Sequence, residues 1–415
     1  MPENILIVGS GGREHAIEVK LRREGHEVFV APGNGGTKNN IQITPNEFEK
    51  LADFAVKKKA FTVVGPDMPL ANGIVDYFES RELQIYGPNK NAAAIESSKA
   101  FAKSFMAAHG IPTASYKTVT DLEEAKHALG EFNPPYVLKA DGLAAGKGVI
   151  IAATEQEAIS VLHDILKNKK FGEAGKKVII EQFLRGEEAS YFVFSDGKDV
   201  IPLMPVRDYK QRDDNNVGPN TGGMGGYAPH RAVDSKMESK ILKTIIKPAI
   251  DGLNKEGRTF RGTLYTGLMI QDNEPLVLEF NARWGDPETQ ILMVMMESPL
   301  LPYLKGSMSG GLKKMPALKW KSGASVNVVM ASGGYPESYE IDKQIKGLEN
   351  VADPDVYVFH AGTKLKDKLL YTNGGRVLNV VATAATPEAA RLKAYGAVKK
   401  ISWQGEFHRM DIGLL

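Results

Sequence analysis

Short apolar runs alternate with helix-like segments over residues 1–90. The runs NILIVG, HEVFVAPG, FTVVGPD and LQIYGP each end in glycine, proline or both, and segments such as NEFEKLADFAVKKK between them have the composition of helices. This alternation predicts a parallel sheet covered by helices on both faces. Ligands of such sheets bind at the carboxyl ends of the strands, which is the edge where the glycine- and proline-rich turns fall.

The pattern changes after NKNAAAIESSKAFAKSFMAAHGIPTA, which predicts a helical linker. From about residue 113, the turn signals SDGK (195–198) and QDNEP (271–275) separate alternating strands and predict hairpins. The stretch KQRDDNNVGPNTGGMGGYAP is too polar and glycine-rich for a core, so it predicts a long loop with a function, or a disordered one. From about residue 321, strands and the helical segment TPEAARLKAYGAVKKI alternate again.

These shifts predict an α/β protein of three domains. We expect an N-terminal α/β substrate-binding domain with a parallel sheet at 1–100, and a central α+β domain at 101–320. The central domain would contain a glycine-loop subdomain at about 115–190. A small C-terminal domain of mixed α/β structure would follow at 321–415. A chain of 415 residues is long enough for two to four domains.

Composition narrows the class of protein. Apolar residues make up 42% and charged residues 25%, with a formal net charge of +2. This balance gives no reason to expect a nucleic-acid or membrane partner, and no apolar run approaches the ~18 residues of a membrane span. The absence of cysteine excludes disulfides, thiolate metal sites and cysteine nucleophiles. The N-terminus lacks the features of a signal peptide, so we expect a cytoplasmic protein.

The opening stretch ILIVGSGGREHAI suggests a dinucleotide-binding turn. That fingerprint needs three glycines and an acidic residue after the second strand. Gly9 and Gly11 match, but Glu14 stands at the third position and the second strand ends in Ala31-Pro32-Gly33. NAD binding is therefore disfavoured. A helix N-terminus still attracts an anion, and an arginine beside it suits a single phosphate. The alternative is a tight turn without a ligand.

A second glycine-rich loop lies in YVLKADGLAAGKGVIIA. Gly142 and Gly146 come before Lys147, but no serine or threonine follows it, and the next residues predict a strand, so this is no P-loop. A hairpin of this kind can close over a triphosphate with its backbone N–H groups. Lys139 on the strand and Lys147 on the loop would neutralise phosphate charge. The alternative is a flexible hairpin with surface lysines.

The strand PLVLEFNARWGDPETQ carries a candidate metal site. Side chains alternate along a strand, so Leu276, Leu278 and Phe280 are expected to pack on one face, with Glu279 and Asn281 on the other. Carboxylate and amide oxygens suit Mg²⁺, which takes its remaining ligands from water and phosphates. Without cysteine or paired histidines, zinc is disfavoured. The alternative is an ordinary solvated polar face.

The segment KVIIEQFLRGEEASYFVFSDG is a candidate nucleotide hinge. A buried strand ends at Glu181, and the residues that leave it, Gln182, Phe183 and Leu184, can present backbone N–H and C=O groups to an adenine ring. Glu188 would accept the ribose hydroxyls. The alternative is a charged loop between two strands.

The order of these features resembles that of ATP-grasp ligases. It runs from Lys103 and Lys139 through the glycine loop and Glu181 to Glu279-x-Asn281. The whole chain resembles the phosphoribosylamine–glycine ligase (glycinamide ribonucleotide synthetase) family. One departure is that TGLMIQD offers no further carboxylate that would face the metal pair. The resemblance rests on the stretches GSGGREHA, APGNGGT, VGPDMPLANGIVD, KADGLAAGKGV, EEAS, GPNTGGMGGY and EFNARWGDPETQ.

The resemblance implies a Rossmann-like N-terminal domain, a central ATP-grasp domain and a two-step ligation in purine biosynthesis. ATP would phosphorylate the carboxylate of glycine, and the amine of 5-phosphoribosylamine would attack the acyl phosphate. The products would be glycinamide ribonucleotide, ADP and phosphate. The cofactors would be ATP with Mg²⁺ or Mn²⁺, and we expect a monomer or a weak dimer.

The resemblance also implies roles for individual residues. Arg283 would hold the glycine carboxylate and the acyl phosphate, and Asp213 or Asp286 would pair with the glycine ammonium. The remaining positions fall into three groups: Lys103, Lys139, Gly142, Lys147, Glu181, Gln182, Phe183, Leu184, Glu188 and Leu278 at ATP; Asn220, Thr221, Gly222, Gly223 and Met224 at the acyl phosphate; and Gly11, Gly12, Arg13, Glu14, Gly33, Asn34 and Asp67 at the sugar phosphate, where Glu14 would contact hydroxyls.

Three alternatives stay open at this point. A related ATP-grasp enzyme that carboxylates or formylates a purine intermediate would share the ATP site. A dinucleotide-binding oxidoreductase would use the opening turn. A regulator that senses a nucleotide would bind ATP without turnover.

Overall fold

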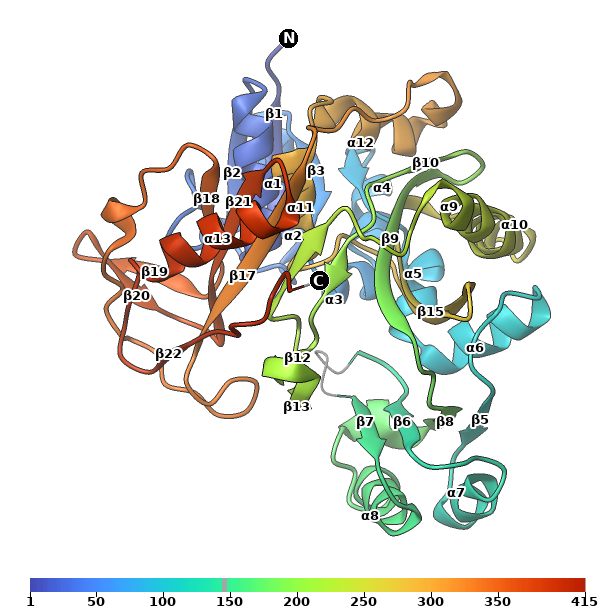
Figure 1. Cartoon of the computed structure of the whole chain (residues 1–415). Coiled ribbons are helices and arrows are strands. Elements are labelled where there is room, and N and C mark those ends of the chain that lie inside the picture. The colour runs from blue at the N-terminus through green and yellow to red at the C-terminus, as the bar shows by residue number, and fades with distance from the viewer. Residues whose placement is uncertain (144–147, 415) are drawn as a thin grey trace.

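The structure is a computed structural model that describes residues 1–143 and 148–414. Its N-terminal sheet is parallel, and its larger sheets beyond residue 110 are antiparallel. Figure 1 shows the N-terminal and C-terminal parts side by side, with the strands of the central region beside them. Within the described residues, no helix is both long and apolar enough to cross a membrane.

The N-terminal sheet has the strand order β2-β1-β3-β4, with every pairing parallel. Side chains of β1 alternate between two cores: Leu6 and Val8 enter one, and Ile5 and Ile7 enter the other. Burial on both faces explains why the strand reads as a continuous apolar run. The predicted parallel sheet is confirmed. Its elements are β1 (Asn4–Gly9), α1 (Gly12–Arg23), β2 (Glu27–Pro32), α2 (Phe48–Lys58), β3 (Phe61–Val64), α3 (Asp67–Ala71), α4 (Ile74–Glu79) and β4 (Ile85–Tyr86).

The predicted linker is two helices, α5 (Lys90–Ser97) and α6 (Lys99–Ala108), that meet at Ser98. Ser98 has an extended backbone, and its hydroxyl caps α6 by accepting a hydrogen bond from Phe101 N. This N-cap starts the second helix. Both helices place side chains toward the site described below.

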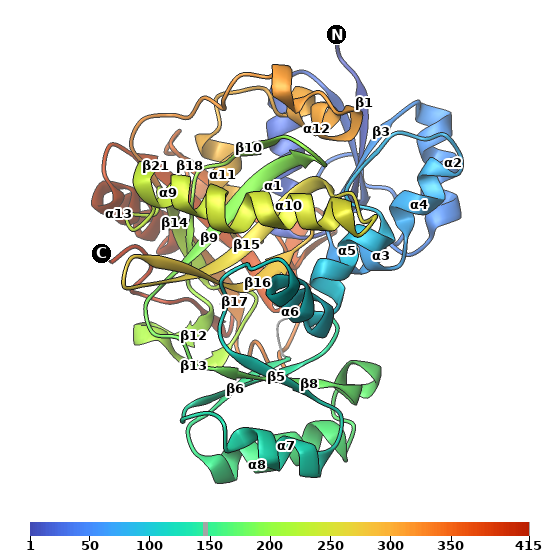
Figure 2. The same ribbon diagram turned by 90° about the vertical axis from the view of Figure 1, so that its right-hand side faces the viewer.

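The glycine-loop hairpin belongs to a small antiparallel sheet with the order β5-β8-β6-β7. This subdomain has its own apolar core and projects from the rest of the molecule, as Figures 1 and 2 show. Lys139 pairs with Val149 across β6 and β7, which confirms the predicted hairpin. Its elements are β5 (Tyr116–Val119), α7 (Leu122–Leu129), β6 (Tyr136–Ala140), β7 (Val149–Ala152), α8 (Glu155–Leu166) and β8 (Val178–Gln182).

The central sheet has the order β10-β9-β15-β16. Both predicted hairpin turns are present, between β9 and β10 and between β15 and β16. Helices α9 and α10 are joined by a π-helical turn at Leu242–Ile246. The elements are β9 (Glu187–Asp196), β10 (Val200–Pro202), α9 (Ser235–Ile241), α10 (Lys247–Lys255), β15 (Arg261–Gln271), β16 (Glu274–Asn281), α11 (Glu288–Met295) and α12 (Leu300–Ser309).

The predicted facing of strand β16 is wrong in one respect. The register with β15 shifts between Glu279 and Val277, so Leu278 is an extra residue in a β-bulge. Leu278 consequently lines the same cavity as Glu279 and Asn281, whereas Val277 enters the core and Phe280 both packs in the core and lines the cavity. A strict alternation of two could not reveal this shift.

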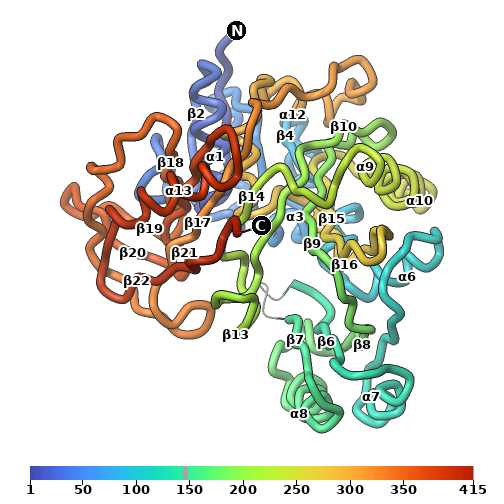
Figure 3. Tube along the Cα trace, viewed as in Figure 1, coloured from blue at the N-terminus to red at the C-terminus, as the bar shows by residue number. Residues whose placement is uncertain are grey.

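The C-terminal sheet has the order β11-β14-β17-β21-β18, with β22 also paired to β17. Figure 3 traces this sheet beside the N-terminal part. Two of its strands, β11 and β14, come from the central third of the chain. The elements are β11 (Arg207–Asp208), β14 (Gly225–Ala228), β17 (Ala324–Ser332), β18 (Val356–His360), β21 (Arg376–Ala384), α13 (Pro387–Val398) and β22 (Glu406–Phe407), with the hairpins β12 (Gln211–Asp213)–β13 (Val217–Asn220) and β19 (Thr363–Lys366)–β20 (Leu369–Thr372).

The prediction of a single long loop at 210–229 is therefore wrong. Gly225 and Gly226 are buried strand residues, and a side chain on either would overlap a carbonyl oxygen, of Asn327 and of Arg207 respectively. Glycine is needed here because the strands approach closely, which a compositional reading takes for a loop. Domain boundaries at 100 and 320 stay predictions, and the sheet itself joins residues from both sides of 320.

Candidate active site

Two adjoining cavities lie where the helical linker, the glycine hairpin and the central sheet meet. The first cavity reaches from Lys103 on α6 to Arg283 after β16. The second cavity continues from Glu181 past Glu188 to Asp286. Residues common to both include Lys139, Glu181, Glu279, Asn281 and Arg283, so the predicted ATP and metal residues are brought together.

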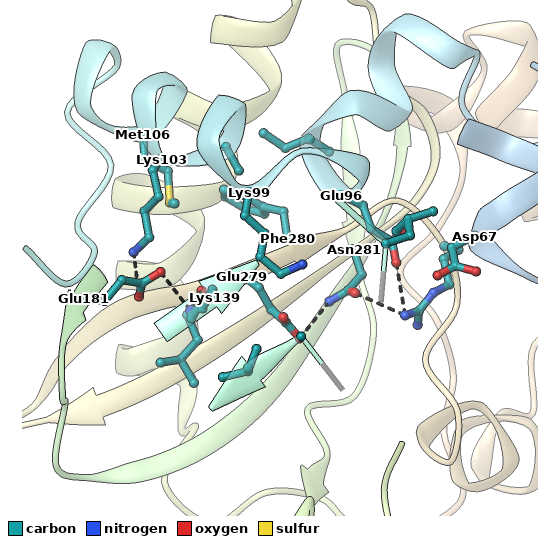
Figure 4. A pocket seen from close by; sticks show the side chains of 17 residues that line it. Asp67, Glu96, Lys99, Lys103, Met106, Lys139, Glu181, Glu279, Phe280 and Asn281 are labelled. Atoms are coloured by element: carbon teal, nitrogen blue, oxygen red, sulfur yellow. Dashed lines mark hydrogen bonds and ion pairs between the residues drawn. The ribbon is translucent and has the colours of Figure 1, made fainter. Parts of the chain in front are cut away.

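The carboxylate of Glu181 lies between two lysines at one end of the first cavity, as Figure 4 shows. Glu181 lies 3.0 Å from Lys103 Nζ and 3.0 Å from Lys139 Nζ, and all three side chains are buried. Burial lowers the pKa of Lys103 to about 8, although Glu181 opposes the shift. Two ammonium groups against one carboxylate leave a surplus of positive charge. This end is suited to an anion such as a phosphate chain.

Glu279 and Asn281 lie side by side in the same cavity, with Asn281 Nδ2 3.4 Å from Glu279 Oε1. Burial raises the pKa of Glu279, but Lys210, Lys139 and Lys99 outweigh it and hold the value at about 2. An ionised carboxylate beside an amide oxygen is a donor set that fits Mg²⁺. Within the described residues, no three acidic or histidine side chains could enclose a metal ion, so phosphates would have to complete such a site.

Arg283 is fixed by a partner that the sequence did not indicate. Its Nη2 lies 3.1 Å from Glu96 Oε1 and donates to Asn281 Oδ1 at 3.1 Å. Glu96 Oε2 accepts a hydrogen bond from Ala282 N at 2.7 Å, so one carboxylate orients both the guanidinium and the backbone before it. Burial lowers the pKa of Arg283, but Glu96 and Asp67 more than compensate and raise it. The guanidinium is therefore held charged at the wall of the cavity.

The residues of the predicted nucleotide hinge line the second cavity. Gln182, Phe183 and Leu184 follow β8 there, and Leu184 packs in an apolar cluster with Met269 that Leu278 also contacts. This wall suits a flat apolar ring.

Glu188 faces Lys210, a residue that sequence reasoning missed. Lys210 Nζ lies 3.8 Å from Glu188 Oε2 and 3.8 Å from Glu279 Oε1. Its position in a polar stretch gave no signal, because only the fold brings it between two carboxylates.

The opening turn is packed by its own glutamate. Glu14 Oε2 accepts a hydrogen bond from Gly11 N at 2.5 Å and closes a capping box, and Glu14 Oε1 lies 2.6 Å from Arg13 Nε. The carboxyl group also packs against Gly9 and Gly65, where a side chain would overlap it. Glu14 thus fills the space that a third glycine would leave. Both of its oxygens are engaged within the fold, and sugar contact by Glu14 stays a prediction.

Arg13 lines the second cavity, where its Nη1 donates to Trp284 O at 3.0 Å. Gly12 packs against Asn379 and Gln290 instead and leaves no room for a side chain. Asp67 lines both cavities.

A third cavity lies on the other side of Asp286. Gly11, Gly33 and Asn34 line it together with Lys364 and Arg376 of the C-terminal region. Asn34 Nδ2 donates to Ser10 O and His360 O, which joins the N-terminal turn to β18. The predicted sugar-phosphate residues of the second strand are thus brought to one surface. Residues from beyond position 360 complete that surface, and sequence reasoning assigned none of them to the site.

The predicted acyl-phosphate loop is only partly in the site. Asn220, Thr221 and Gly222 line the second cavity, but Met224 is fully buried in the fold. Gly223 packs against Pro287 and Asp208.

Of the two candidates for the ammonium, Asp286 lines the second and third cavities. Asp213 pairs instead with Arg212 at 2.8 Å and lines neither cavity. Gly142 accepts a hydrogen bond from Lys99 Nζ at 2.8 Å through its carbonyl. Lys147 lies outside the described residues.

Comparisons with known proteins agree with this arrangement. Family models of phosphoribosylglycinamide synthetase match along the chain: the N domain at residues 3–96, the ATP-grasp (A) domain at 97–289 and the C domain at 325–415. A Pseudomonas aeruginosa protein named phosphoribosylamine–glycine ligase is 47% identical over 99% of this chain and 97% of its own length. The chain belongs to the phosphoribosylglycinamide synthetase family. Membership confirms the predicted family, the ATP-grasp fold and the use of ATP.

Comparison with solved structures also finds similarity to a phosphoribosylamine–glycine ligase. Phosphoribosylamine–glycine ligase from Thermotoga maritima is 36% identical, with a TM-score of 0.86 over 98% of this chain and 99% of that one. A biotin carboxylase domain of Hydrogenobacter thermophilus shares the fold at 15% identity, with a TM-score of 0.76, 98% of this chain and 92% of that chain being covered. The ATP-grasp architecture therefore extends to carboxylases, whereas the close sequence match is to the synthetase family.

Proposed function

We propose that this chain is an ATP-dependent, ADP-forming ligase that joins glycine to 5-phosphoribosylamine in purine biosynthesis. Glycyl phosphate would form first, and the amine would then displace its phosphate to give glycinamide ribonucleotide. The observation that carries the proposal is the cavity itself, in which the Lys103–Glu181–Lys139 cluster lies beside Glu279, Asn281 and Arg283. Relatives that match over nearly their whole length bear the name of this activity.

The side chains suit an in-line phosphoryl transfer, which depends on positioning and on neutralising charge. Lys103 and Lys139 would hold the phosphates of ATP, with the hinge residues and Leu278 against the adenine ring and Glu188 at the ribose. Arg283, held charged by Glu96, would orient the glycine carboxylate toward the γ-phosphate.

Glu279 and Asn281 would hold Mg²⁺ or Mn²⁺, which when bound to phosphate oxygens draws charge from the leaving group. The donor set of one carboxylate and one amide requires further oxygens from the nucleotide.

The third cavity would receive the sugar phosphate of the second substrate. Arg13 lines the second cavity, Lys364 lines the third, and Arg376 lines both. Phosphoribosylamine lying across the boundary at Asp286 would bring its amine toward the acyl phosphate. We further propose a cytoplasmic enzyme, monomeric or weakly dimeric, with domain boundaries near 100 and 320.

The decisive experiment measures phosphate release and glycinamide ribonucleotide with purified protein. Turnover should need ATP, Mg²⁺, glycine and phosphoribosylamine together, and replacing glycine with formate or bicarbonate should abolish it. Turnover with bicarbonate or formate would favour a carboxylating or formylating enzyme. ATP binding without any turnover would favour a regulator, and NADH fluorescence that changes on titration would favour an oxidoreductase.

A further inference from the structure

The hairpin β12–β13 forms part of the wall of the second cavity but has no core of its own. Gln211 and Asn220, at its open end, line the cavity together with Thr221. Among the described residues, its two strands pair only with each other, and none of residues 211–220 is buried. A lone two-stranded hairpin is marginally stable in water, so this wall depends on contacts from outside the hairpin.

Those contacts come from Arg409, whose side chain is fully buried. Its Nη1 donates to Gln211 O at 3.0 Å, and its Nη2 donates to Asn216 Oδ1 at 2.9 Å. Asp411 accepts from Arg409 Nε at 2.7 Å and from Nη2 at 2.6 Å, and its Oδ2 also accepts from Asn215 N at 2.8 Å. This two-point pairing fixes the plane of the guanidinium, which thus holds the hairpin at its first strand and at its turn.

The segment that carries Arg409 is anchored in the C-terminal core. Ile412 is fully buried in that core. The hydroxyl group of Tyr395 on α13 donates to Arg409 O at 2.7 Å and accepts from Ile412 N at 3.1 Å. Figure 1 shows this segment, which follows β22, passing close to β12. The hairpin is therefore attached to a packed domain through one buried arginine.

The backbone of the turn indicates that its shape is held from outside. Asn215 and Asn216 both have positive φ, of 62° and 55°, which residues other than glycine rarely adopt. Such a backbone persists where the surroundings fix it. Met410 N donates to Asp214 Oδ1 at 2.7 Å, next to the bonds from Arg409 and Asp411. The segment after β22 thus contacts each of the three residues of the turn.

We propose that Arg409 is a positioning residue for the reaction and, with Asp411, holds the β12–β13 hairpin in place at the second cavity. Arg409 is not among the described residues that line this cavity, so it acts through Gln211 and Asn220. The inference rests on the proposed ligase function, because Asn220 and Thr221 belong to the predicted acyl-phosphate wall.

The first test measures backbone hydrogen–deuterium exchange and steady-state kinetics of Arg409→Met. Exchange in residues 211–221 should become at least ~10-fold faster, because the hairpin loses hydrogen bonds from a charged donor. With the wall displaced, kcat should fall roughly 10- to 100-fold. KM for ATP should stay within about 3-fold, since its proposed ligands lie on α6, β6 and β8. Arg409→Lys keeps the charge but not the forked geometry, so it should restore only part of kcat.

A matched pair of variants tests the contact from the side of the hairpin. Asn215 and Asn216 are adjacent, exposed and both left-handed, but among the described residues only the side chain of Asn216 accepts from Arg409. Asn216→Gly should therefore speed exchange of the turn by ~10-fold and lower kcat by about 3-fold. Asn215→Gly suits the same backbone and keeps its N–H for Asp411, so both quantities should stay within about 2-fold of wild type.

Three results would overturn the inference. Unchanged exchange of the hairpin in Arg409→Met would show that Arg409 does not hold it. Faster exchange of the hairpin with unchanged kcat would show a contact without a role in the reaction. Exchange that rises equally in β17 and β21, with kcat and KM for ATP changing together, would show a merely structural role. If melting curves show that Arg409→Met does not fold, equal behaviour of the two glycine variants would overturn the inference.

Wild-type turnover separates this inference from the proposed function. If wild-type protein forms no glycinamide ribonucleotide, the ligase assignment fails, and the proposed role in the reaction fails with it. Exchange of the hairpin in Asn216→Gly and Asn215→Gly is measured without turnover and still shows whether Arg409 holds it. If wild-type protein forms the product and these two variants have the same kcat and exchange, only the role of Arg409 fails.

Discussion

The two ends of the cavity differ in the sign of the charge they leave uncompensated. At the Lys103 end, one glutamate serves two lysines, each 3.0 Å away. At the Asp208 end, one lysine lies between Glu188 and Glu279, and two further carboxyl groups lie nearby. Buried charges are expensive, so both surpluses would be retained only if ligands compensate them. The cationic end suits a polyphosphate, and the anionic end suits an ammonium.

The difference teaches that burial alone does not define a binding site. The cationic end is the more deeply buried: its three side chains are at most 7% exposed, whereas Lys210 is 25% exposed and Glu188 and Glu279 are each 34% exposed. What determines the ligand that each end suits is the ratio of cations to carboxylates. Glu279 lies where the two ends meet, in contact with Lys210 and under the field of Lys139.

Replacing the residue at that meeting point should have the largest effect. Glu279→Gln should lower Mg²⁺-dependent turnover by ~100- to 1000-fold or more, because it removes the ionised ligand and leaves Lys210 without one of its partners. Steady-state kinetics at saturating ATP and Mg²⁺ measure this. Glu274→Gln, at the exposed start of the same strand, should leave turnover unchanged. Turnover close to that of the wild type would remove Glu279 from the metal site.

Removing a charge from the cationic end should lower kcat/KM for ATP but leave the affinity for glycine unchanged. Lys139→Met should lower kcat/KM for ATP by ~100-fold, because the side chain loses its charge beside the phosphates and its bond to Leu278 O. Glycine affinity, measured by calorimetry, should stay within about 3-fold. Lys117→Met on the exposed face of β5 is the control. A comparable loss of glycine affinity would show that the two ends do not act separately.

The positioning of Arg283 should produce an intermediate effect. Glu96→Gln keeps the shape of the side chain but removes the charge that holds the guanidinium, so kcat/KM for glycine should fall by about 10-fold while KM for ATP stays within about 2-fold. A purely structural role of Glu96 would move both constants together. Glu123→Gln on the exposed face of α7 should change neither.

The smallest expected effect is that of pH on kcat/KM for ATP, through the protonation of Lys103. The pKa of Lys103 is lowered by burial to about 8, so its ammonium is charged below pH 8 and loses its proton above it. We expect kcat/KM for ATP to fall as pH rises past about 8, and Lys103→Arg to flatten this limb. The folded chain gives up this proton at lower pH than the unfolded chain does. This group alone therefore raises the free energy of unfolding as pH rises from about 8 toward 10.5. A profile unchanged in Lys103→Arg would contradict the assignment.

The cationic end could be predicted from sequence because its signals are local. Lys139 stands on a strand that precedes a glycine hairpin, and Glu181 ends a buried strand. Glu279 and Asn281 alternate on a third. Strand periodicity and turn composition were sufficient to place these elements, and they missed only the bulge at Leu278.

The anionic end could not be predicted in this way. Asp208 and Glu288 are 80 positions apart, and Lys210 lies in a stretch that reads as a polar loop. Their side chains come together only because the short strands β11 and β14 join the C-terminal sheet. The sequence also gave no sign that Glu96 belongs to the site, because a glutamate in an alanine-rich helix is usually a solvated surface charge. Such positions carry no pattern that distinguishes them from surface residues.

The shared sheet has a consequence for how the enzyme is made in a cell. Strand β14 of the central region pairs with β17, and Arg376 reaches back to the carbonyl groups of Gly222 and Asp286. A ribosome delivers the N-terminal residues first, so β14 is synthesised before β17. Until β17 follows, the edge of β14 that pairs with it has no partner strand. The third cavity then lacks Arg376 until most of the chain has been synthesised. A nascent chain could therefore form the first cavity early, yet the third cavity would be completed only near the end of translation.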